Sequence, residues 1–205
     1  MYYQLTETLS CCLVEEYWVF LDCVADRYFA IQAKGLQSGA PDLANPAFRS
    51  CALSNFRADA LTPVIVSGPR VKLDTGKGPR DLRSCLAAYI CLVRAFLMRS
   101  GHFAKFEAIS GKARHRIQAL EPKASLEQSV RSFEAVMRWL PVENQCLPQA
   151  LALQEFLVSA GHDAMVVVGV AINPFKAHCW VQNGDHVLLQ APEFVRGYYP
   201  IRVFR

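Results

Sequence analysis

The chain has 205 residues, of which 52% are hydrophobic and 20% charged, and its formal net charge at pH 7 is +4. This length suffices for one good-sized domain or two small ones, and the composition excludes a disordered chain. The Lys and Arg residues form no long basic stripe with interleaved aromatic side chains, which argues against a nucleic-acid-binding protein.

The amino terminus has neither a basic start nor an unbroken apolar run, so we expect no signal peptide. The most apolar window, Cys85–Met98, contains Arg94 and is too short to span a membrane. The eight cysteines include no CxxC pair and no zinc-ligand spacing of histidine and cysteine. These features predict a cytoplasmic protein with reduced cysteines and no metal site.

The first third of the chain is predicted to be rich in β-strands. Tyr2–Glu7 is one candidate strand, while Glu15–Cys23 and Arg27–Ala33 form a candidate hairpin because they are rich in aromatic and β-branched residues. Loop residues follow. A short helix is expected at residues 47–60 and a short strand at residues 63–68.

The middle of the chain is predicted to be helical. Val71–Asp81 forms a candidate linker, since Gly, Lys and Pro replace the apolar periodicity. Its last residue is expected to cap a helix that reaches about Ser100. Ser125 and Gln128 resemble a capping box, which predicts a second helix that Pro141 terminates.

The last third has the clearest pattern. Pro148 fits the first turn of a helix and Gly161 fits its end. A run of β-branched residues then predicts a buried strand at residues 163–172. Two further strands, 177–182 and 186–190, are expected to flank an Asn-Gly hairpin turn. The predicted order is therefore helix, strand, strand, strand.

Cys146 stands directly before the predicted helix of the last third. Unpaired backbone N–H groups and the helix macrodipole favour a negative charge there, so this thiol is expected to have a lowered pKa. The same N–H groups can donate to an oxyanion that forms on a substrate carbonyl. Gln145, the preceding residue, is a candidate for a further side-chain donor.

His178 is the natural base or ion-pair partner for such a thiolate, because it starts a strand that should pack beside the helix. Tracing the hairpin brings Gln190 near it, where the amide can orient the imidazole. Cys179, next to His178, is expected to point to the opposite face of the strand. Cys146 and His178 also have ordinary structural interpretations, as a helix-start residue and a half-buried strand residue.

Several pieces of the last third occur in a specific order: Cys146–Leu147 before an Ala/Leu-rich helix, VVVGV at 166–170, Pro174–Phe175, and AHCWV at 177–181. In this order they resemble the transglutaminase-like cysteine proteases of lasso peptide biosynthesis, over roughly residues 130–192. The resemblance implies an α+β fold. Helices pack on an antiparallel sheet, as in transglutaminases and papain-like enzymes, after a small β-rich amino-terminal module.

The resemblance implies that Cys146 is the nucleophile and His178 the base. The third catalytic position of the family is usually an aspartate, and this chain has Gln190 there, in the sequence LQAP. An amide can orient an imidazole but stabilises an imidazolium less than a carboxylate does. Asp185 and Glu193 are alternatives that lie off the expected position.

The resemblance also implies a bacterial peptidase that cuts the leader from a ribosomally made precursor peptide and has no cofactor of its own. Its partners would be the precursor and a separate lasso cyclase, similar to asparagine synthetase, that uses ATP and Mg. Residues 81–205 are predicted to be the protease domain. Residues 1–75 are predicted to be a leader-recognition module, whose hairpin binds the leader as an added strand, or else an ordinary hairpin packed on the helices.

Two other functions stay open at this point. One is a catalytically inert chaperone that binds the precursor and presents it to the cyclase, and Gln190 is the feature that favours it. The other is acyl transfer to an amine, as in transglutaminases, which the same residues can support.

Overall fold

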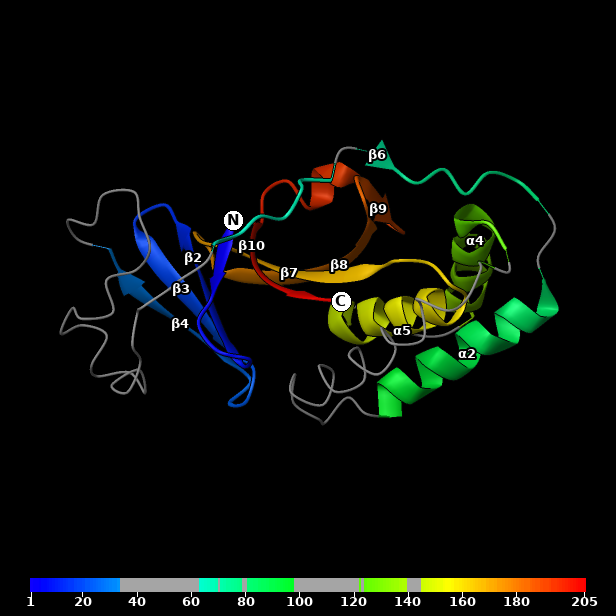
Figure 1. The fold of residues 1–205 in the computed structure, drawn as a ribbon, viewed down its shortest axis with the longest axis horizontal. Coiled ribbons are helices and arrows are strands. Elements are labelled where there is room, and N and C mark those ends of the chain that lie inside the picture. Colours follow the sequence, from blue (N-terminus) through cyan, green and yellow to red (C-terminus); the bar gives the residue numbers. More distant parts are fainter. Residues whose placement is uncertain (34–62, 70, 79–80, 98–121, 123, 140–144) are drawn as a thin grey trace.

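The computed structural model describes residues 1–33, 63–69, 71–78, 81–97, 122, 124–139 and 145–205. Within these residues the chain forms two five-stranded sheets and three α-helices (Figure 1). None of these helices is long and apolar enough to cross a membrane. The helix expected at residues 47–60 lies outside the described residues.

The first sheet has the strand order β4-β3-β2-β1-β5. Its strands are β1 (Tyr2–Gln4), β2 (Leu9–Val14), β3 (Tyr17–Asp22), β4 (Arg27–Gln32) and β5 (Pro63–Val64). The predicted hairpin is confirmed as β3 and β4, and the short strand expected at residues 63–68 is confirmed as β5. The predicted strand Tyr2–Glu7 ends early. Strand β2 was not predicted, because it is buried on both faces and so shows no alternation of polar and apolar residues.

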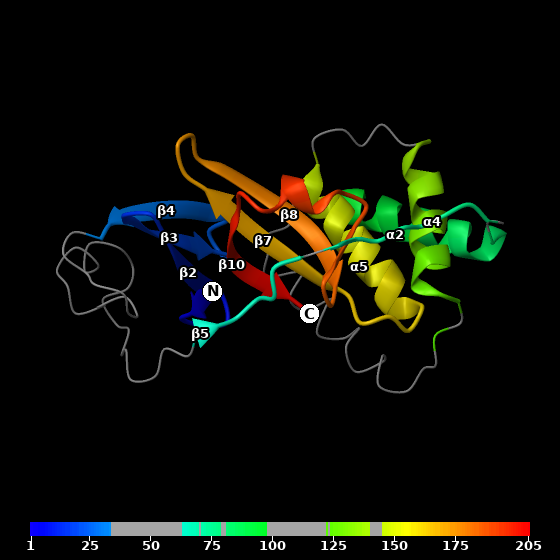
Figure 2. The same ribbon diagram turned by 90° about the horizontal axis from the view of Figure 1, so that it is seen from above.

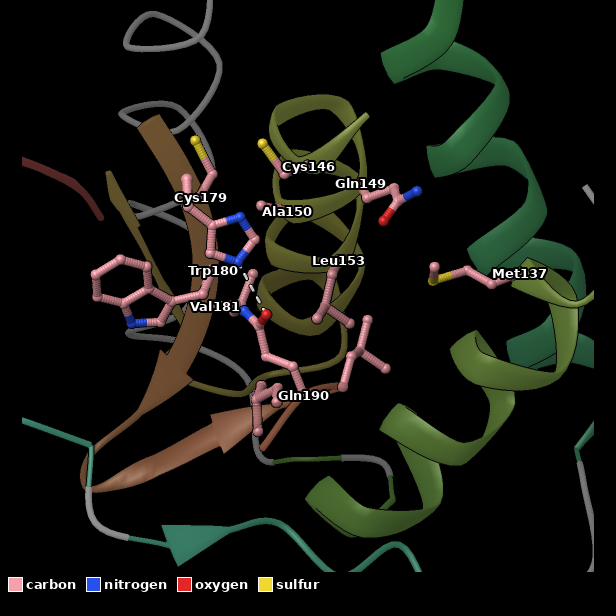
Figure 3. Close-up of a pocket in the computed structure, with 12 residues that line it drawn as sticks. Met137, Cys146, Gln149, Ala150, Leu153, Cys179, Trp180, Val181 and Gln190 are labelled. Carbon is pink, nitrogen blue, oxygen red and sulfur yellow. Dashed lines mark hydrogen bonds between the residues drawn. The ribbon is translucent and has the colours of Figure 1, made fainter. Parts of the chain in front are cut away.

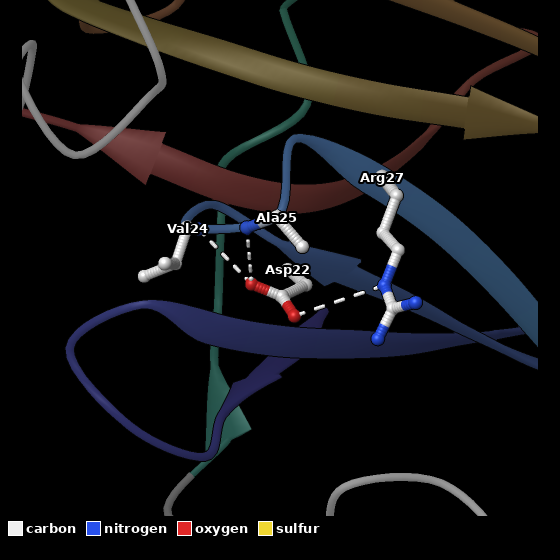
Figure 4. Close-up of polar contacts among 4 residues, drawn as sticks. All are labelled: Asp22, Val24, Ala25 and Arg27. Atoms are coloured by element: carbon white, nitrogen blue, oxygen red, sulfur yellow. Dashed lines mark hydrogen bonds and ion pairs between the residues drawn. The ribbon is translucent and has the colours of Figure 1, made fainter.

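The turn between β3 and β4 is held by the carboxylate of Asp22 (Figure 4). Its Oδ1 atom accepts hydrogen bonds from the backbone N–H groups of Val24, at 3.0 Å, and Ala25, at 2.9 Å. Its Oδ2 atom lies 3.9 Å from the guanidinium of Arg27. An aspartate that bonds to the backbone two and three residues later is a common way to fix a turn, so this short loop sets the register of the hairpin.

The second sheet has the strand order β10-β7-β8-β9-β6. Its strands are β6 (Val71–Lys72), β7 (Met165–Ala171), β8 (Lys176–Asn183), β9 (His186–Leu188) and β10 (Tyr199–Phe204). The three predicted strands of the last third are confirmed as β7, β8 and β9, although β9 stops before Gln190. Strand β10 was not predicted.

The predicted linker Val71–Asp81 is wrong at its first residues. Val71 and Lys72 form β6, which pairs in parallel with β9, and the next residue, Leu73, is buried. A strand of two residues is too short to show a periodic pattern in the sequence. The nearby Gly and Pro residues instead favour the prediction of a loop.

The three helices are α2 (Leu82–Leu97), α4 (Leu126–Met137) and α5 (Cys146–Ser159). Asp81 caps α2 as predicted, since its Oδ2 accepts from the backbone N–H of Ser84 at 2.9 Å. Ser125 caps α4 in the same way, accepting from the N–H of Gln128 at 3.2 Å. The helices gather toward one end of the second sheet and the first sheet lies toward its other end (Figures 1 and 2).

One hydrophobic core runs through both sheets and all three helices, for example through Val19, Val168 and Leu157. The buried Arg202 of β10 donates to the backbone carbonyls of Thr6 and Glu7, and so ties the β1–β2 turn to the second sheet. Apolar burial of this kind is the main stabilising contribution to a fold. The division into residues 1–75 and 81–205 stays a prediction, and the two parts share this core.

A buried pair of polar side chains joins α4 to the end of α5, and it predicts a loss of stability in acid. Ser129 Oγ lies 3.1 Å from His162 Nε2. Burial lowers the pKa of His162, and the nearby Glu127 opposes this only in part. The unfolded chain therefore binds a proton near pH 6.5 that the folded chain resists, so the free energy of unfolding falls as the pH drops below that value.

Urea unfolding at pH 7.5 and 5.5 checks this expectation. The variant His162→Gln should lose less stability than the wild type between the two pH values. The matched control His186→Gln, which removes a histidine from β9, should behave as the wild type does. Equal pH dependence in the wild type and His162→Gln would contradict the assignment.

Candidate active site

Cys146 is the first residue of α5, one position earlier than the helix start expected from Pro148. Gln145 precedes it in a conformation that is neither helical nor extended, with φ −120° and ψ 62°, and its side chain makes no capping hydrogen bond. Pro148 lacks an N–H, so the free donors of the first helical turn are the backbone N–H groups of the residues that precede Pro148. The half-buried Cys146 is therefore at the start of the helix, and the expected effect of these N–H groups on its thiol stays a prediction.

Strand β8 packs against α5 and brings Cys179 to the thiol of Cys146. Alternation places Cys179 on the strand face that looks toward α5, within the main core, whereas Trp180 belongs to a cluster on the other face. Cys179 therefore points to the strand face opposite that of His178, as expected. This face is the one that packs against α5, where Cys146 lies. The sequence suggested no role for Cys179, because nothing local indicates which helix covers that face.

The thiol of Cys146 is strongly acidic in this setting. The hydrogen bond from the Cys179 thiol lowers its pKa most, and His178 and the backbone N–H of Cys179 lower it further. Burial acts in the opposite direction, but the pKa still falls to about 4. Cys146 is therefore a thiolate at neutral pH.

His178 reaches Cys146 from the open edge of β8. Strand β9 pairs with β8 only as far as Val181 and Leu188, so no strand of the described chain covers that edge at His178. The contact with Cys146 raises the pKa of His178, with a smaller contribution from Gln190. This favours the imidazolium form, which completes an ion pair with the thiolate.

Gln190 holds the other side of the imidazole ring. Its Oε1 atom lies 2.9 Å from His178 Nε2 (Figure 3, dashed line), which leaves Nδ1 to face Cys146. The chain turns there through Leu189, a residue with a φ of 68°, in the left-handed region that side chains other than glycine rarely adopt. Asp185 and Glu193, the alternatives to Gln190, make no hydrogen bond to His178 within the described chain.

Two aromatic rings flank the imidazole. The ring centroid of Tyr198 lies 5.4 Å from that of His178, and the Trp180 centroid lies 6.3 Å away. Gly169 pairs with His178 across β7 and β8. A Cβ atom there would lie 2.7 Å from the Trp180 ring and 2.9 Å from the Tyr198 Cβ. Sequence reasoning missed Tyr198 and Gly169, because only the β7–β8 pairing and the loop before β10 bring them to His178.

Gly169→Ala is expected to impair both stability and activity. The added methyl group must displace Trp180 or Tyr198, which overpacks the site and lowers the free energy of unfolding by about 1–3 kcal/mol. A displaced imidazole should also lower kcat/KM by roughly 10- to 100-fold, since small misplacements of catalytic groups are costly. Urea unfolding and substrate turnover measure the two effects.

Gly68→Ala is the matched control, because a Cβ at Gly68 would have no neighbour within 4 Å. This variant should match the wild type in both measurements. If Gly169→Ala also matched the wild type, the aromatic rings would have no part in placing His178.

A sequence model of the transglutaminase-like superfamily matches residues 88–203, more than half of the chain. The chain belongs to the transglutaminase-like superfamily. The family and the α+β fold expected from the sequence are thus confirmed. Microcin J25-processing protein McjB of Escherichia coli is 30% identical over 84 residues, which is 41% of this chain and 40% of that protein. The match therefore spans less than half of this relative. No solved structure matches significantly.

The superfamily match begins inside α2 and ends in β10, so it contains Cys146, His178 and Gln190 together with their supporting strands. It does not include β1 to β5, and the identification of that sheet as a leader-recognition module stays a prediction. Within the described chain, no group of three or more His, Cys, Asp or Glu side chains is placed to hold a metal ion.

A pocket of about 170 Å³ opens beside these transglutaminase-like site residues. Figure 3 shows it between α5, the end of α4 and β8. Its walls beyond the thiol and imidazole are mostly apolar and come from Met137, Ala150, Leu153 and Leu188, with Gln149 as a polar member. Small apolar side chains of a bound peptide fit a space of this size and character.

Proposed function

We propose that the protein is a cysteine peptidase that removes the leader from a ribosomally made lasso peptide precursor. The observation that carries the proposal is the acidic thiol of Cys146 in contact with His178, whose ring Gln190 orients. The relative in Escherichia coli is named as a processing protein for a microcin. Both points support cutting of a peptide precursor by a thiolate nucleophile.

In this proposal the Cys146 thiolate attacks the carbonyl carbon of the last leader residue. The carbonyl oxygen becomes an oxyanion, which the free N–H groups of the first turn of α5 stabilise. The His178 imidazolium gives its Nδ1 proton to the leaving amine, and the C–N bond breaks to leave a thioester. Water then attacks the thioester while His178 takes up its proton, which releases the leader acid and restores the thiolate.

Gln190 acts in this scheme by orientation rather than by charge. Its carbonyl oxygen accepts from Nε2–H of His178 and so keeps Nδ1 directed at the thiol. A neutral amide stabilises the imidazolium less than the aspartate usual in the family. The contact with the Cys146 thiolate, which is the main cause of the raised pKa of His178, compensates for this.

We also propose that the first sheet binds the leader. Strand β4 is the last strand of that sheet among the described residues, so a peptide can add to it through main-chain hydrogen bonds. Tyr28 of β4 contacts Phe175 of the β7–β8 turn, with ring centroids 5.4 Å apart. Burial raises the pKa of Tyr28, and the nearby thiols of Cys179, Cys23 and Cys146 contribute. A leader on β4 would therefore lie close to the thiolate.

The further partner in this proposal is an ATP- and Mg-dependent cyclase in the bacterial cytoplasm.

The test uses synthetic peptides that match the short open reading frames beside the gene of this protein. Each is incubated with the purified protein in water enriched in ¹⁸O, and the products are weighed by mass spectrometry. A peptidase yields a leader fragment with ¹⁸O in its new carboxylate. Transfer to an added amine instead of water indicates an acyltransferase. A peptide that binds without being cut supports the inert presenter, and then the peptidase proposal fails.

The pH dependence of cleavage should be bell-shaped. The ion pair needs Cys146 ionised and His178 protonated, and it exists only between their two pKa values. Because the pKa of Cys146 is about 4, kcat/KM should rise through that pH. Because the pKa of His178 is raised, kcat/KM should fall only above pH 6.5. Initial rates from pH 3 to 10 on the peptide identified above measure both limbs, and a single rise near pH 8.5 would contradict the ion pair.

A further inference from the structure

Cys179 shares the pocket with Cys146 although it belongs to another element. It comes from β8, is 7% exposed and packs within the main core. Both cysteines line the same cavity, and Figure 3 shows their two sulfur atoms on the side of the pocket where α5 begins. The sulfur of Cys179 is thus directed at the start of the helix rather than into a purely apolar region.

The side chain and the backbone N–H of Cys179, beside Cys146 in this pocket, both lower the pKa of the Cys146 thiol. Strand β9 ends opposite Val181, so within the described chain no strand competes for this N–H on the open edge. A thiol S–H is only a weak donor to neutral acceptors, but hydrogen bonds to an ionised acceptor are about twice as strong. Two donors from one residue therefore hold the anion from the strand side.

The direction of the S–H···S⁻ bond follows from the two environments. Contact with Cys146 and then burial raise the pKa of Cys179 well above its ordinary value, so Cys179 keeps its proton. Cys146, half-buried at a helix start, is the partner that loses its proton. Burial raises the pKa of a thiol, and it is the main cause of the raised pKa values of Cys11 and Cys12 in the first sheet. The pKa of Cys146 is lowered in spite of burial, because Cys179 and His178 stabilise the thiolate.

We propose that Cys179 is a positioning residue that holds the Cys146 thiolate, through its S–H and its backbone N–H, in the orientation from which it attacks. The proposal deepens the proposed function, because it assigns two further donors, beside His178, to the same nucleophile. Its role differs from that of His178, since Cys179 gives up no proton during the reaction. The alternative is that Cys179 only fills space in the core, as its neighbours there do.

The test measures the rate at which iodoacetamide alkylates Cys146 between pH 3 and 9, with the modified residue mapped by mass spectrometry. The variants are Cys179→Ala, which removes the S–H donor, and Cys179→Ser, which supplies a hydroxyl donor. In Cys179→Ala the midpoint of the profile should move up by at least one pH unit, which is about a tenfold loss of thiolate at acid pH. Cys179→Ser should keep a midpoint close to that of the wild type.

Cys91→Ala is the matched control, because Cys91 is also 7% exposed and belongs to the same core. It loses the same atoms and should keep the wild-type profile, while urea unfolding shows whether the two alanine variants are equally destabilised. If Cys179→Ala does not fold, Cys179→Val fills the space without a donor and replaces it in the comparison with Cys179→Ser. Equal profiles for all variants, or equal shifts in Cys179→Ser and Cys179→Ala, would overturn the proposal.

This experiment needs no peptide substrate, so it separates the two proposals. A shifted pH profile of alkylation in Cys179→Ala supports the positioning role even if the wild type cuts no precursor. The absence of cleavage would contradict only the proposed peptidase function. If the wild type cuts the precursor but the alkylation profile of Cys179→Ala is unshifted, the peptidase function is supported and the positioning role of Cys179 is contradicted.

Discussion

Cys146→Ala is expected to lower kcat/KM for leader cleavage by about 10⁴-fold or more, because it removes the atom that forms the thioester. The fold should survive, since the Cys146 side chain is only half-buried and its replacement leaves α5 intact. The variant should still bind the precursor, because the leader contacts proposed for β4 lie outside the substituted atom. Mass spectrometry of the cleavage products and a binding titration with the same peptide measure the two properties.

Cys85→Ala provides the control for this prediction. Cys85 is another half-buried thiol, and its Sγ atom makes a long contact of 3.9 Å with the Ser132 carbonyl, away from the pocket. Its activity should equal that of the wild type. If Cys146→Ala retained substantial cleavage, another nucleophile would be responsible. If the wild type and Cys146→Ala were both inactive but bound the precursor equally, the inert presenter would be the better account.

His178→Ala is expected to have the second largest effect. It removes both the proton donor for the leaving amine and a partner that lowers the pKa of Cys146. We expect kcat/KM to fall by about 10³-fold or more. Alkylation of Cys146 by substoichiometric iodoacetamide at pH 6 should slow as well, because less of the thiol is ionised.

The change in the alkylation rate of Cys146 separates the contribution of His178 to the lowered pKa of this thiol from that of Cys179. Because the Cys179 donors remain in His178→Ala, some low-pH reactivity should persist, whereas the combined variant His178→Ala/Cys179→Ala, which keeps only the backbone N–H of residue 179, should react more slowly than either single variant at low pH. His186→Ala removes a histidine from β9, outside the pocket, and should leave both measurements unchanged. Undiminished selectivity for Cys146 in His178→Ala would show that His178 is not its ion-pair partner.

The local signals in the sequence were reliable where one element could be judged by itself. The caps at Asp81 and Ser125 are confirmed, because capping depends on side chains and backbone groups only two or three residues apart. The Cys146 helix was recognised from Pro148, although it begins slightly earlier. The long run of β-branched residues identified β7, since few other structures bury such a run.

The errors share a different cause. Strands β6 and β10 are held by neighbouring strands that are distant in the sequence, whereas β2 pairs with its sequence neighbours β1 and β3 but is buried on both faces and so shows no alternation of polar and apolar residues. Val71 pairs with His186, for example, and β10 pairs with β7. Such pairings contribute hydrogen bonds that no local pattern reveals, so the Gly and Pro residues of Val71–Asp81 alone predict a linker there.

The sequence by itself determined that a cysteine stands at the start of a helix, that a histidine follows on a later strand with a glutamine after it, and that these pieces occur in the order of a transglutaminase-like protein. Periodicity and capping suffice for this, because they report local conformation. Only the tertiary structure decided that β8 turns Cys179 toward Cys146 and that Tyr198 lies against His178. Alternation along a strand shows that a side chain is buried, but which helix or loop covers it depends on packing between segments far apart in the chain.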